Sequence, residues 1–457
     1  METFLIKTIQ LLLCFCLLIL LHEGGHFFFA KLFKVRVEKF CLFFGKSLKL
    51  FTWRGTDYCI GWLPLGGYVK ISGMIDESMD TEQMKQPAKP WEFRSKPAWQ
   101  RLLIMLGGVM VNFLLALLIY AMILFTWGDT YVPVRNMEHG FKFNTEAQQL
   151  GFRDGDILLG TEHKAFDRYA PGDVYRDISE ATQVSVLRQG KEFRISLPGD
   201  LNMLEMLKAE PPFVMPLAPA LIDSIIPNSP AAKAGIRVGD RLVAFNGRTM
   251  STWNEFDFSM SDLQSSISAY DKDADKRISD SLRHVSIVVR HAGAGDALDT
   301  ISLKLDANAM MGIVKHNPYA DYKIVTREYG FFESLPAGVN HGWNVFCGYV
   351  NDLKYVFTSD GAKSIGSFGT IGSLFPAQWD WLRFWELTAF ISLMLAFLNV
   401  LPIPALDGGH VLFLLYEVVT RRKPSDKFLE RAQWVGMGML FLLMAYAIFN
   451  DLLRFVF

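Results

Sequence analysis

Four long apolar runs constrain the fold of this chain more than any other feature of its sequence. A helix needs about 20 apolar residues to cross a bilayer, so each run is a candidate membrane span. The first run is too long for a cleaved signal peptide, and no small-residue cleavage site follows it. The fourth run reaches the required length only with its flanking aromatic residues. The runs extend from about Phe4 to Ala30, Leu102 to Phe125, Trp381 to Leu401 and Val435 to Phe449.

The composition is typical of a chain that lies only partly in the membrane. Of the 457 residues 51% are hydrophobic and 20% are charged, so we expect water-soluble domains between the spans. The net charge of -1 offers no basic excess for phosphates, which argues against nucleic acid as a partner. The five cysteines form no CxxC pair, and we expect neither a disulfide framework nor a cysteine-rich zinc site.

Lysine and arginine residues predict the orientation of the spans. They are frequent between the first two spans and again between the last two, where Arg421, Arg422 and Lys423 follow one another. Short loops rich in these residues stay in the cytoplasm. We therefore expect both chain ends in the cytoplasm and the region from about Gly128 to Asp380 on the opposite side.

The region between the second and third spans contains a repeat. "LGFRDGDILLG" (Leu150 to Gly160) and "AGIRVGDRLVAFNG" (Ala234 to Gly247) share an apolar-Gly-apolar-Arg-x-Gly-Asp pattern followed by a strand-like run. Such repetition suggests two related domains in tandem, and both stretches resemble the PDZ domain. The alternative is two Gly-Asp turns in unrelated β domains. After the repeat, apolar residues recur every three or four positions from Phe332 to Phe357, which predicts an amphipathic helix at the outer membrane surface or beneath the repeat.

The first apolar run ends in a motif whose residues could bind a metal ion and catalyse a reaction. In "LLILLHEGGHFFFAKLF", His22 and His26 are four residues apart and share one helical face, so both imidazoles can reach one metal ion. Glu23 lies about 100° round the helix, where it can reach water beside the metal. H-E-x-x-H is typical of zinc peptidases, with the glutamate as general base. The alternative is that these polar residues are hydrogen-bonded and have no catalytic role. A charged side chain at the centre of a span costs about 2.5–3.5 kcal/mol, which argues for a function instead.

A catalytic zinc ion needs a third protein ligand and an open position. The candidates lie in "FLNVLPIPALDGGHVLF" at the end of the third span, and they are Asn399, Asp407 and His410. Pro402 and Pro404 break the helix there, which is tolerated at membrane depth only where the backbone is buried in protein or lines a cavity. Chemistry alone does not choose between Asp407 and His410.

These motifs together resemble the site-2 protease family of intramembrane zinc metalloproteases, most closely its bacterial regulator proteases. The resemblance implies that Asp407 is the third zinc ligand, that His410 has a supporting role and that Asn399 contacts the substrate. It covers the whole chain and rests on "HEGGH", "PLGGYVK" (Pro64 to Lys70), "GGVMVNF" (Gly107 to Phe113), the repeat and "NVLPIPALDGG" (Asn399 to Gly409).

The chain departs from the family pattern at three places, and no ligand is lost at any of them. Gly24 stands where a large apolar residue is usual, "GV" replaces Gly-Pro in the second span, and "FGTIG" (Phe368 to Gly372) matches Ser-Gly-Pro loosely. Gly24 and Gly25 each weaken a helix by about 1 kcal/mol relative to alanine. We therefore expect close backbone packing at both glycines, beside the zinc ion.

The loop after the first span is predicted to form strands. "VEKFCLFFGKSLKLF" and "TDYCIGWLPLGGYVKI", joined by the Arg54-Gly55 turn, have strand-like composition. A strand edge that includes Gly66, Gly67 and Tyr68 could receive an unwound substrate by backbone pairing and expose its peptide bonds. The alternative is a hairpin with a structural role only.

The predicted fold is a multi-pass α-helical membrane protein of four spans, with a cytoplasmic membrane-associated β hairpin or sheet and two extracytoplasmic PDZ-like α+β domains. The resemblance implies an intramembrane zinc endopeptidase of the bacterial inner membrane that cuts single-span membrane proteins already shortened outside the cell membrane, anti-sigma factors among them. The alternative is a PDZ-bearing scaffold with a structural zinc site. A zinc transporter is disfavoured because four spans without an inverted repeat suit transport poorly. The predicted segments are 1–127, 128–212 and 213–320 (the two PDZ-like domains), 321–380 and 381–457.

Overall fold

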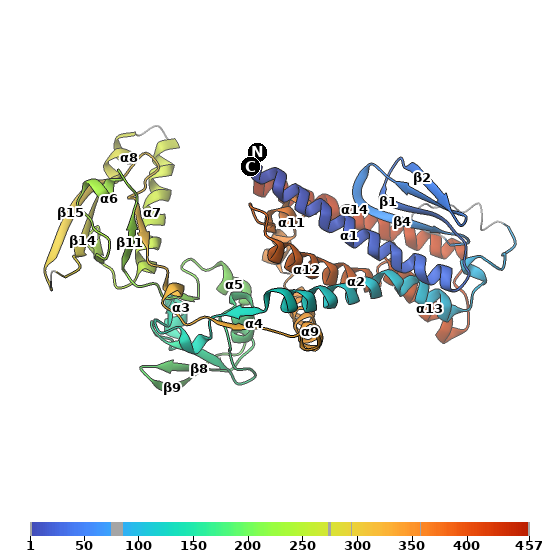
Figure 1. Ribbon diagram of the computed structural model, residues 1–457, viewed down its shortest axis with the longest axis horizontal. Coiled ribbons are helices and arrows are strands. Elements are labelled where there is room, and N and C mark those ends of the chain that lie inside the picture. Colours follow the sequence, from blue (N-terminus) through green and yellow to red (C-terminus); the bar gives the residue numbers. More distant parts are fainter. Residues whose placement is uncertain (1, 75–85, 273–275, 294, 357, 456–457) are drawn as a thin grey trace. The chain divides into compact units, whose positions relative to one another are not determined.

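The computed structural model describes residues 2–74, 86–272, 276–293, 295–356 and 358–455, and the chain forms two compact units (Figure 1). The helical unit combines Met1–Asp129 with Arg327–Phe457, and the inserted unit is Thr130–Thr326. At the junction, β5 (Asp129–Tyr131) pairs with β17 (Val325–Arg327). The two ends of the inserted segment are therefore neighbours.

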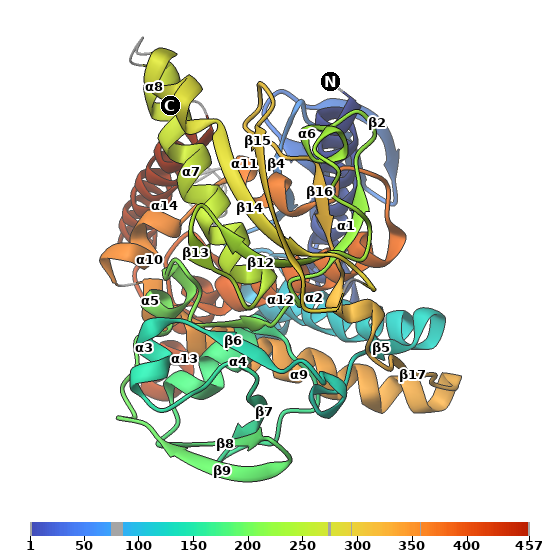
Figure 2. The ribbon, with the colours of Figure 1, turned by 90° about the vertical axis from the view of Figure 1, so that its left-hand side faces the viewer.

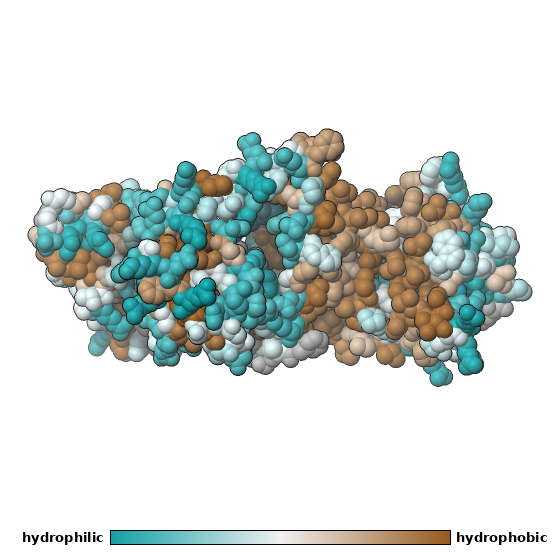
Figure 3. All heavy atoms as spheres, turned by 90° about the horizontal axis from the view of Figure 1, so that it is seen from below, coloured by the Kyte–Doolittle hydropathy of each residue, from teal (hydrophilic) through white to brown (hydrophobic). Residues whose placement is uncertain are grey.

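Among the described residues, four helices are long and apolar enough to cross a membrane, as the sequence predicts. The surface of the helical unit includes a broad hydrophobic area, drawn in brown in Figure 3. The last helix extends beyond the predicted apolar run because its more polar ends are also helical. The four are α1 (Glu2–Leu32), α2 (Ala98–Trp127), α12 (Trp381–Val400) and α14 (Asp426–Phe455).

Helix α2 packs against most of the helical unit, including α1, α12, α9 (Phe331–Val356) and α13 (Asp407–Thr420). It meets α1 closely at Gly25, where an added Cβ would lie 2.5 Å from the carbonyl carbon of Gly107 and 2.9 Å from the nitrogen of Gly108. The prediction of equally close packing at Gly24 is wrong, because a Cβ there would meet nothing within 4 Å. Successive residues differ by about 100° round a helix, so only one of the two glycines faces α2.

Helix α9 is the amphipathic helix predicted after the repeat, although Phe357 lies outside the described residues. It packs on α2 through small residues, since Gly338 lies against the backbone of Ala121 and Gly342 against Leu117. Several of its large apolar side chains remain exposed, with Phe332 82% exposed. A helix that buries glycine and exposes phenylalanine has an apolar face suited to lipid.

A four-stranded sheet follows α1, in the region where strands were predicted. The strand order is β2-β3-β1-β4, with β1 parallel to β3 and antiparallel to β4. Strand β4 is therefore an edge strand, and it packs against α1. The strands are β1 (Val37–Phe44), β2 (Leu48–Trp53), β3 (Thr56–Ile60) and β4 (Leu63–Ile71).

The structure contains one disulfide, although the sequence predicted no disulfide framework. Cys41 of β1 and Cys59 of β3 form a disulfide. They are register partners in adjacent parallel strands, with their Cα atoms 4.5 Å apart, so the sheet rather than any sequence spacing brings them together. Cys14, Cys16 and Cys347 are free.

Short helices complete the helical unit near the start of α12. Asp451 of α14 accepts hydrogen bonds from the backbone nitrogens and hydroxyl groups of Ser367 and Thr370, at 2.5–3.1 Å. This carboxylate therefore fixes the first turn of α11 on α14. The short helices before α12 are α10 (Ser359–Ser364) and α11 (Phe368–Leu374), and η2 (Phe93–Ser95) lies just before α2.

The inserted unit contains two halves with matching local structure, as the sequence repeat predicts. In the first half the buried carboxylate of Asp156 accepts from the backbone nitrogen of Arg153 and forms an ion pair with Arg188. In the second half Asp240 accepts from the backbone nitrogen of Arg237 and pairs with His291. The elements of the first half are η3 (Val134–Asn136), β6 (Phe141–Phe143), α3 (Thr145–Gln149), β7 (Ile157–Thr161), α4 (Pro171–Ser179), β8 (Gln183–Arg188), β9 (Lys191–Ser196), α5 (Met203–Lys208) and β10 (Val214–Pro216), which pairs with β6.

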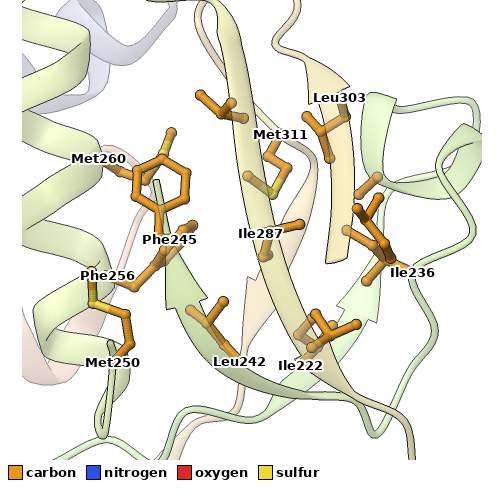
Figure 4. Packing of buried hydrophobic residues seen from close by; sticks show 14 of the residues in the cluster. Ile222, Ile236, Leu242, Phe245, Met250, Phe256, Met260, Ile287, Leu303 and Met311 are labelled. Atoms are coloured by element: carbon orange, nitrogen blue, oxygen red, sulfur yellow. The ribbon is translucent and has the colours of Figure 1, made fainter. Parts of the chain in front are cut away.

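The second half has its own apolar core, shown in Figure 4. Phe256 and Met260 from α7 pack on Phe245 and Ile287 from the sheet β13-β12-β14-β15, and α7 lies beside this sheet in Figure 2. The elements are β11 (Ile222–Ile225), α6 (Pro230–Lys233), β12 (Arg241–Phe245), β13 (Arg248–Thr249), α7 (Trp253–Lys272), α8 (Lys276–Leu282), β14 (His284–Arg290), β15 (Leu298–Lys304), β16 (Ile313–Lys315) and η4 (Pro318–Ala320).

Candidate metal centre and active site

Three predicted ligand residues meet inside the helical unit. His22 and His26 come from adjacent turns of α1, and Asp407 is the first residue of α13. The Nε2 atoms of the two histidines are 3.3 Å apart, and each lies 3.3 Å from Asp407 Oδ2. Zinc binds nitrogen and oxygen at about 2.0–2.2 Å, so tetrahedral ligand atoms are about 3.3–3.5 Å apart. The triangle therefore has the dimensions of a tetrahedral zinc site.

The donor set also fits a metal ion in its chemistry. Asp407 Oδ2 is buried and accepts no hydrogen bond from any described residue. A buried carboxylate oxygen without a donor is costly unless a cation or proton satisfies it. Two imidazole nitrogens and one carboxylate oxygen are ordinary ligands of catalytic zinc.

The structure separates the two candidates for the third ligand. Among the described residues, one group of three histidine, cysteine or acidic residues brings its ligand atoms within 4.8 Å of one another, and it is His22, His26 and Asp407. His410 lines the same cavity but lies outside this group. The geometry thus favours Asp407, and its role as a zinc ligand remains a prediction.

The chain break before α13 shapes this site. Helix α12 ends at Val400, and the segment from Leu401 to Leu406 forms turns before α13 begins, with the backbone nitrogen of Leu406 donating to the oxygen of Ile403. Gly409 allows this turn, because a Cβ there would lie 2.6 Å from the carbonyl oxygen of Ile403. On the other side, Gly436 of α14 lies directly against the carbonyl group of Pro404. The segment that presents Asp407 is therefore held by glycines from two helices.

A cavity of about 460 Å³ opens beside the triangle. Glu23 is 9% exposed and lies between α1 and β4, where the backbone nitrogen of Val69 faces its carboxylate. Gly67 makes this approach possible, since an added Cβ would lie 3.3 Å from Glu23 Cγ and 2.7 Å from Ile19. All the predicted site residues line the cavity: His22, Glu23, His26, Gly66, Gly67, Tyr68, Asn399 and Asp407.

Helix α2 contributes contacts that the sequence analysis did not predict. The Nδ1 atom of His26 lies 2.8 Å from the carbonyl oxygen of Ile104, and Nδ1 of His22 lies 3.3 Å from Nδ2 of Asn112. Both rings rest on Gly108, where a Cβ would lie 2.6 Å from His22 Cε1. The sequence feature that could have indicated these contacts is Asn112, an isolated amide in an apolar span, close to Gly107 and Gly108.

The sequence also matches known proteins along nearly its whole length. The profile of peptidase family M50 matches residues 10–443. The chain belongs to peptidase family M50. Over 479 aligned positions it is 29% identical to "Regulator of sigma-E protease RseP" of Escherichia coli (strain K12), covering 99% of this chain and all of that protein. It is 28% identical to "Protease RseP" of Yersinia pestis, with 96% of both chains covered.

Membership of family M50 confirms two predictions made from the motifs. The resemblance to site-2 proteases holds across the chain, and the chain is a metalloendopeptidase of the site-2 type. Family membership also makes the chain an intramembrane protease, and the described residues include four helices long and apolar enough to cross a membrane.

Proposed function

We propose that this M50 peptidase uses one zinc ion to cut the transmembrane segment of single-span membrane proteins that have already lost most of their outer domain. The observation that carries the proposal is the 3.3 Å triangle of His22, His26 and Asp407, set beside Glu23 in a cavity among the spanning helices. A structural zinc site needs four protein ligands and no cavity. The proposed site has three candidate ligands among the described residues, with a cavity beside them.

The residues of the triangle and Glu23 have different roles in the proposed chemistry. His22, His26 and Asp407 would hold the zinc ion, which when bound polarises the scissile carbonyl and makes water a stronger nucleophile. Glu23 takes a proton from the attacking water and then delivers it to the leaving nitrogen. Its burial between α1 and β4 keeps the carboxylate in place for both transfers.

The edge strand β4 is the proposed seat of the substrate. Peptide bonds inside a helix are hydrogen-bonded and shielded, so a substrate has to unwind before it is cut. Strand β4 pairs with β1 along one edge only, and Gly66, Gly67 and Tyr68 line the cavity. A substrate strand added to β4 would run past Glu23. Asn399, which also lines the cavity, would hold the substrate from the α12 side.

The same proposal assigns places to the two units. We propose that the protein lies in the inner membrane of a bacterium, with the sheet and both chain ends on the cytoplasmic side. The inserted unit would be a pair of PDZ-like domains on the periplasmic side. The positive residues of the loops support this orientation. The lipid bilayer and membrane-anchored substrates, anti-sigma factors among them, would be its partners, and nucleic acid would not.

A peptide cleavage assay tests the function directly. Purified protein in detergent is mixed with a fluorescent transmembrane peptide, with and without a zinc chelator, beside the Glu23→Gln variant. The variant keeps all three ligands and the shape of the side chain, so we expect one zinc per chain and no cleavage. Chelation should stop cleavage by the native protein, and added zinc should restore it. Cleavage that survives Glu23→Gln would exclude this residue as the base, and zinc without any cleavage would favour a scaffold.

A further inference from the structure

The surroundings of the two histidines suggest a role for Asn112 that rests on the proposed zinc site. A neutral imidazole carries its proton on one nitrogen and offers a lone pair on the other, and the partner of the protonated nitrogen selects the form. To bind zinc through Nε2, each histidine of the triangle must donate a hydrogen bond from Nδ1.

His26 meets this requirement through the backbone of α2. Its Nδ1 atom lies 2.8 Å from the carbonyl oxygen of Ile104, which can only accept a hydrogen bond. The proton of a neutral His26 therefore lies on Nδ1, and the lone pair on Nε2 faces Asp407 at 3.3 Å.

His22 has a neighbour of the opposite character at the same atom. Its Nδ1 lies 3.3 Å from Nδ2 of Asn112, an amide donor, while Oδ1 of Asn112 is buried and accepts no hydrogen bond from the described residues. With the amide this way round, Nδ1 accepts and the proton moves to Nε2, where it points at the metal position. A carboxamide has nearly the same shape after a turn of 180°, so its oxygen can occupy the place of its nitrogen.

We propose that Asn112 is the positioning residue of His22, with Oδ1 accepting the Nδ1–H bond so that the Nε2 lone pair is directed at the zinc position. The fold supports a fixed acceptor here. Asn112 is fully buried, and its backbone oxygen accepts a hydrogen bond of 2.7 Å from Ser392 of α12. Ile104 and Asn112, two turns apart on α2, would thus select the same imidazole form in both histidines.

The test measures zinc affinity rather than cleavage, in the full-length chain carrying Glu23→Gln. Competition with a coloured chelator gives the affinity of this parent and of three further variants, Asn112→Ala, Asn112→Asp and Ser392→Ala. We expect Asn112→Ala to weaken zinc binding about 10- to 100-fold, the usual effect of losing a partner of a metal-binding histidine. Asn112→Asp has the same shape and accepts through both oxygens, so it should keep the affinity of the parent.

The controls separate positioning from packing. Ser392→Ala removes a buried contact of the same residue without touching His22 and should leave zinc affinity unchanged. Zinc binding by Asn112→Ala that equals the parent's, or binding by Asn112→Asp weaker than by Asn112→Ala, would overturn the inference. A parent that binds no zinc would instead refute the proposed metal site. Thermal unfolding of each variant shows whether it is folded.

Discussion

Replacing Gly25 with alanine should disable the protease, although this residue is neither a ligand nor a base. The new Cβ would lie 2.5 Å from the carbonyl carbon of Gly107 and 2.9 Å from the nitrogen of Gly108. Carbon atoms in ordinary contact are about 3.5–4.0 Å apart, so α1 and α2 must separate by about 1 Å. Both neighbours are backbone atoms, and no side-chain rotation can relieve the contact.

The two effects of this substitution can be separated in magnitude. Overpacking costs about 1–3 kcal/mol of unfolding free energy, while alanine in place of glycine stabilises a helix by about 1 kcal/mol. The net loss of stability is therefore small. The displacement matters more, because α1 carries His22 and His26 and a shift of about 1 Å at a catalytic site can cost about 100-fold in rate.

The neighbouring glycine provides the matched control. Gly24→Ala adds the same methyl group to the same helix, where it meets nothing within 4 Å. We expect Gly24→Ala to cleave a transmembrane peptide at the native rate and to unfold at a slightly higher temperature, with Gly25→Ala about 100-fold slower. Equal cleavage rates in the two variants would refute the argument that the approach of α1 to α2 sets the geometry of the metal centre.

Three further predictions concern the third ligand, the inserted unit and pH. Asp407→Ala should lower both zinc content and cleavage, whereas His410→Ala should keep the zinc; the reverse result would exchange their roles. A chain in which a short linker replaces residues 130–326, whose ends meet at the β5–β17 pair, should cut an untrimmed substrate that the native enzyme refuses, and both should cut the trimmed one equally; continued refusal would make the unit a receptor. Hydrogen bonds to Asp240, and to a lesser extent Asp299, raise the pKa of His291. The contribution of His291 to folding stability is therefore complete below its unfolded pKa of about 6.5. This contribution is lost as the pH rises through the pKa of the folded state. Urea unfolding followed by tryptophan fluorescence should show His291→Asn less stable than the native chain at pH 5 and equally stable at pH 9.

The sequence predicts the features that depend on local spacing. The length of an apolar run indicates a membrane span without knowledge of its neighbours, and a four-residue interval places His22 and His26 on one face of α1. Pro402 and Pro404 likewise mark the end of α12 before the segment that leads to Asp407. Each of these features follows from residues close together in the chain.

Features that depend on tertiary packing could not be predicted in the same way. Gly24 and Gly25 look equivalent in the sequence, and only the position of α2 distinguishes them. Cys41 and Cys59 become partners because β3 pairs in parallel with β1, an order that strand composition does not specify. The contact between Asn112 and His22 joins residues 90 positions apart. Chemistry left Asp407 and His410 as alternatives for the same reason.

The contact between Gly436 and Pro404 makes the C-terminal helix part of the metal site. Helix α14 contains none of the proposed ligands, yet it supports the segment that presents Asp407. A chain that stops before α14 would retain every residue of the catalytic motifs and lose one wall of the segment that holds the aspartate. We therefore expect the protease to stay inactive during synthesis until α14 has been made and packed against this segment. The order of translation would thus delay proteolysis until the enzyme is fully inserted in its membrane.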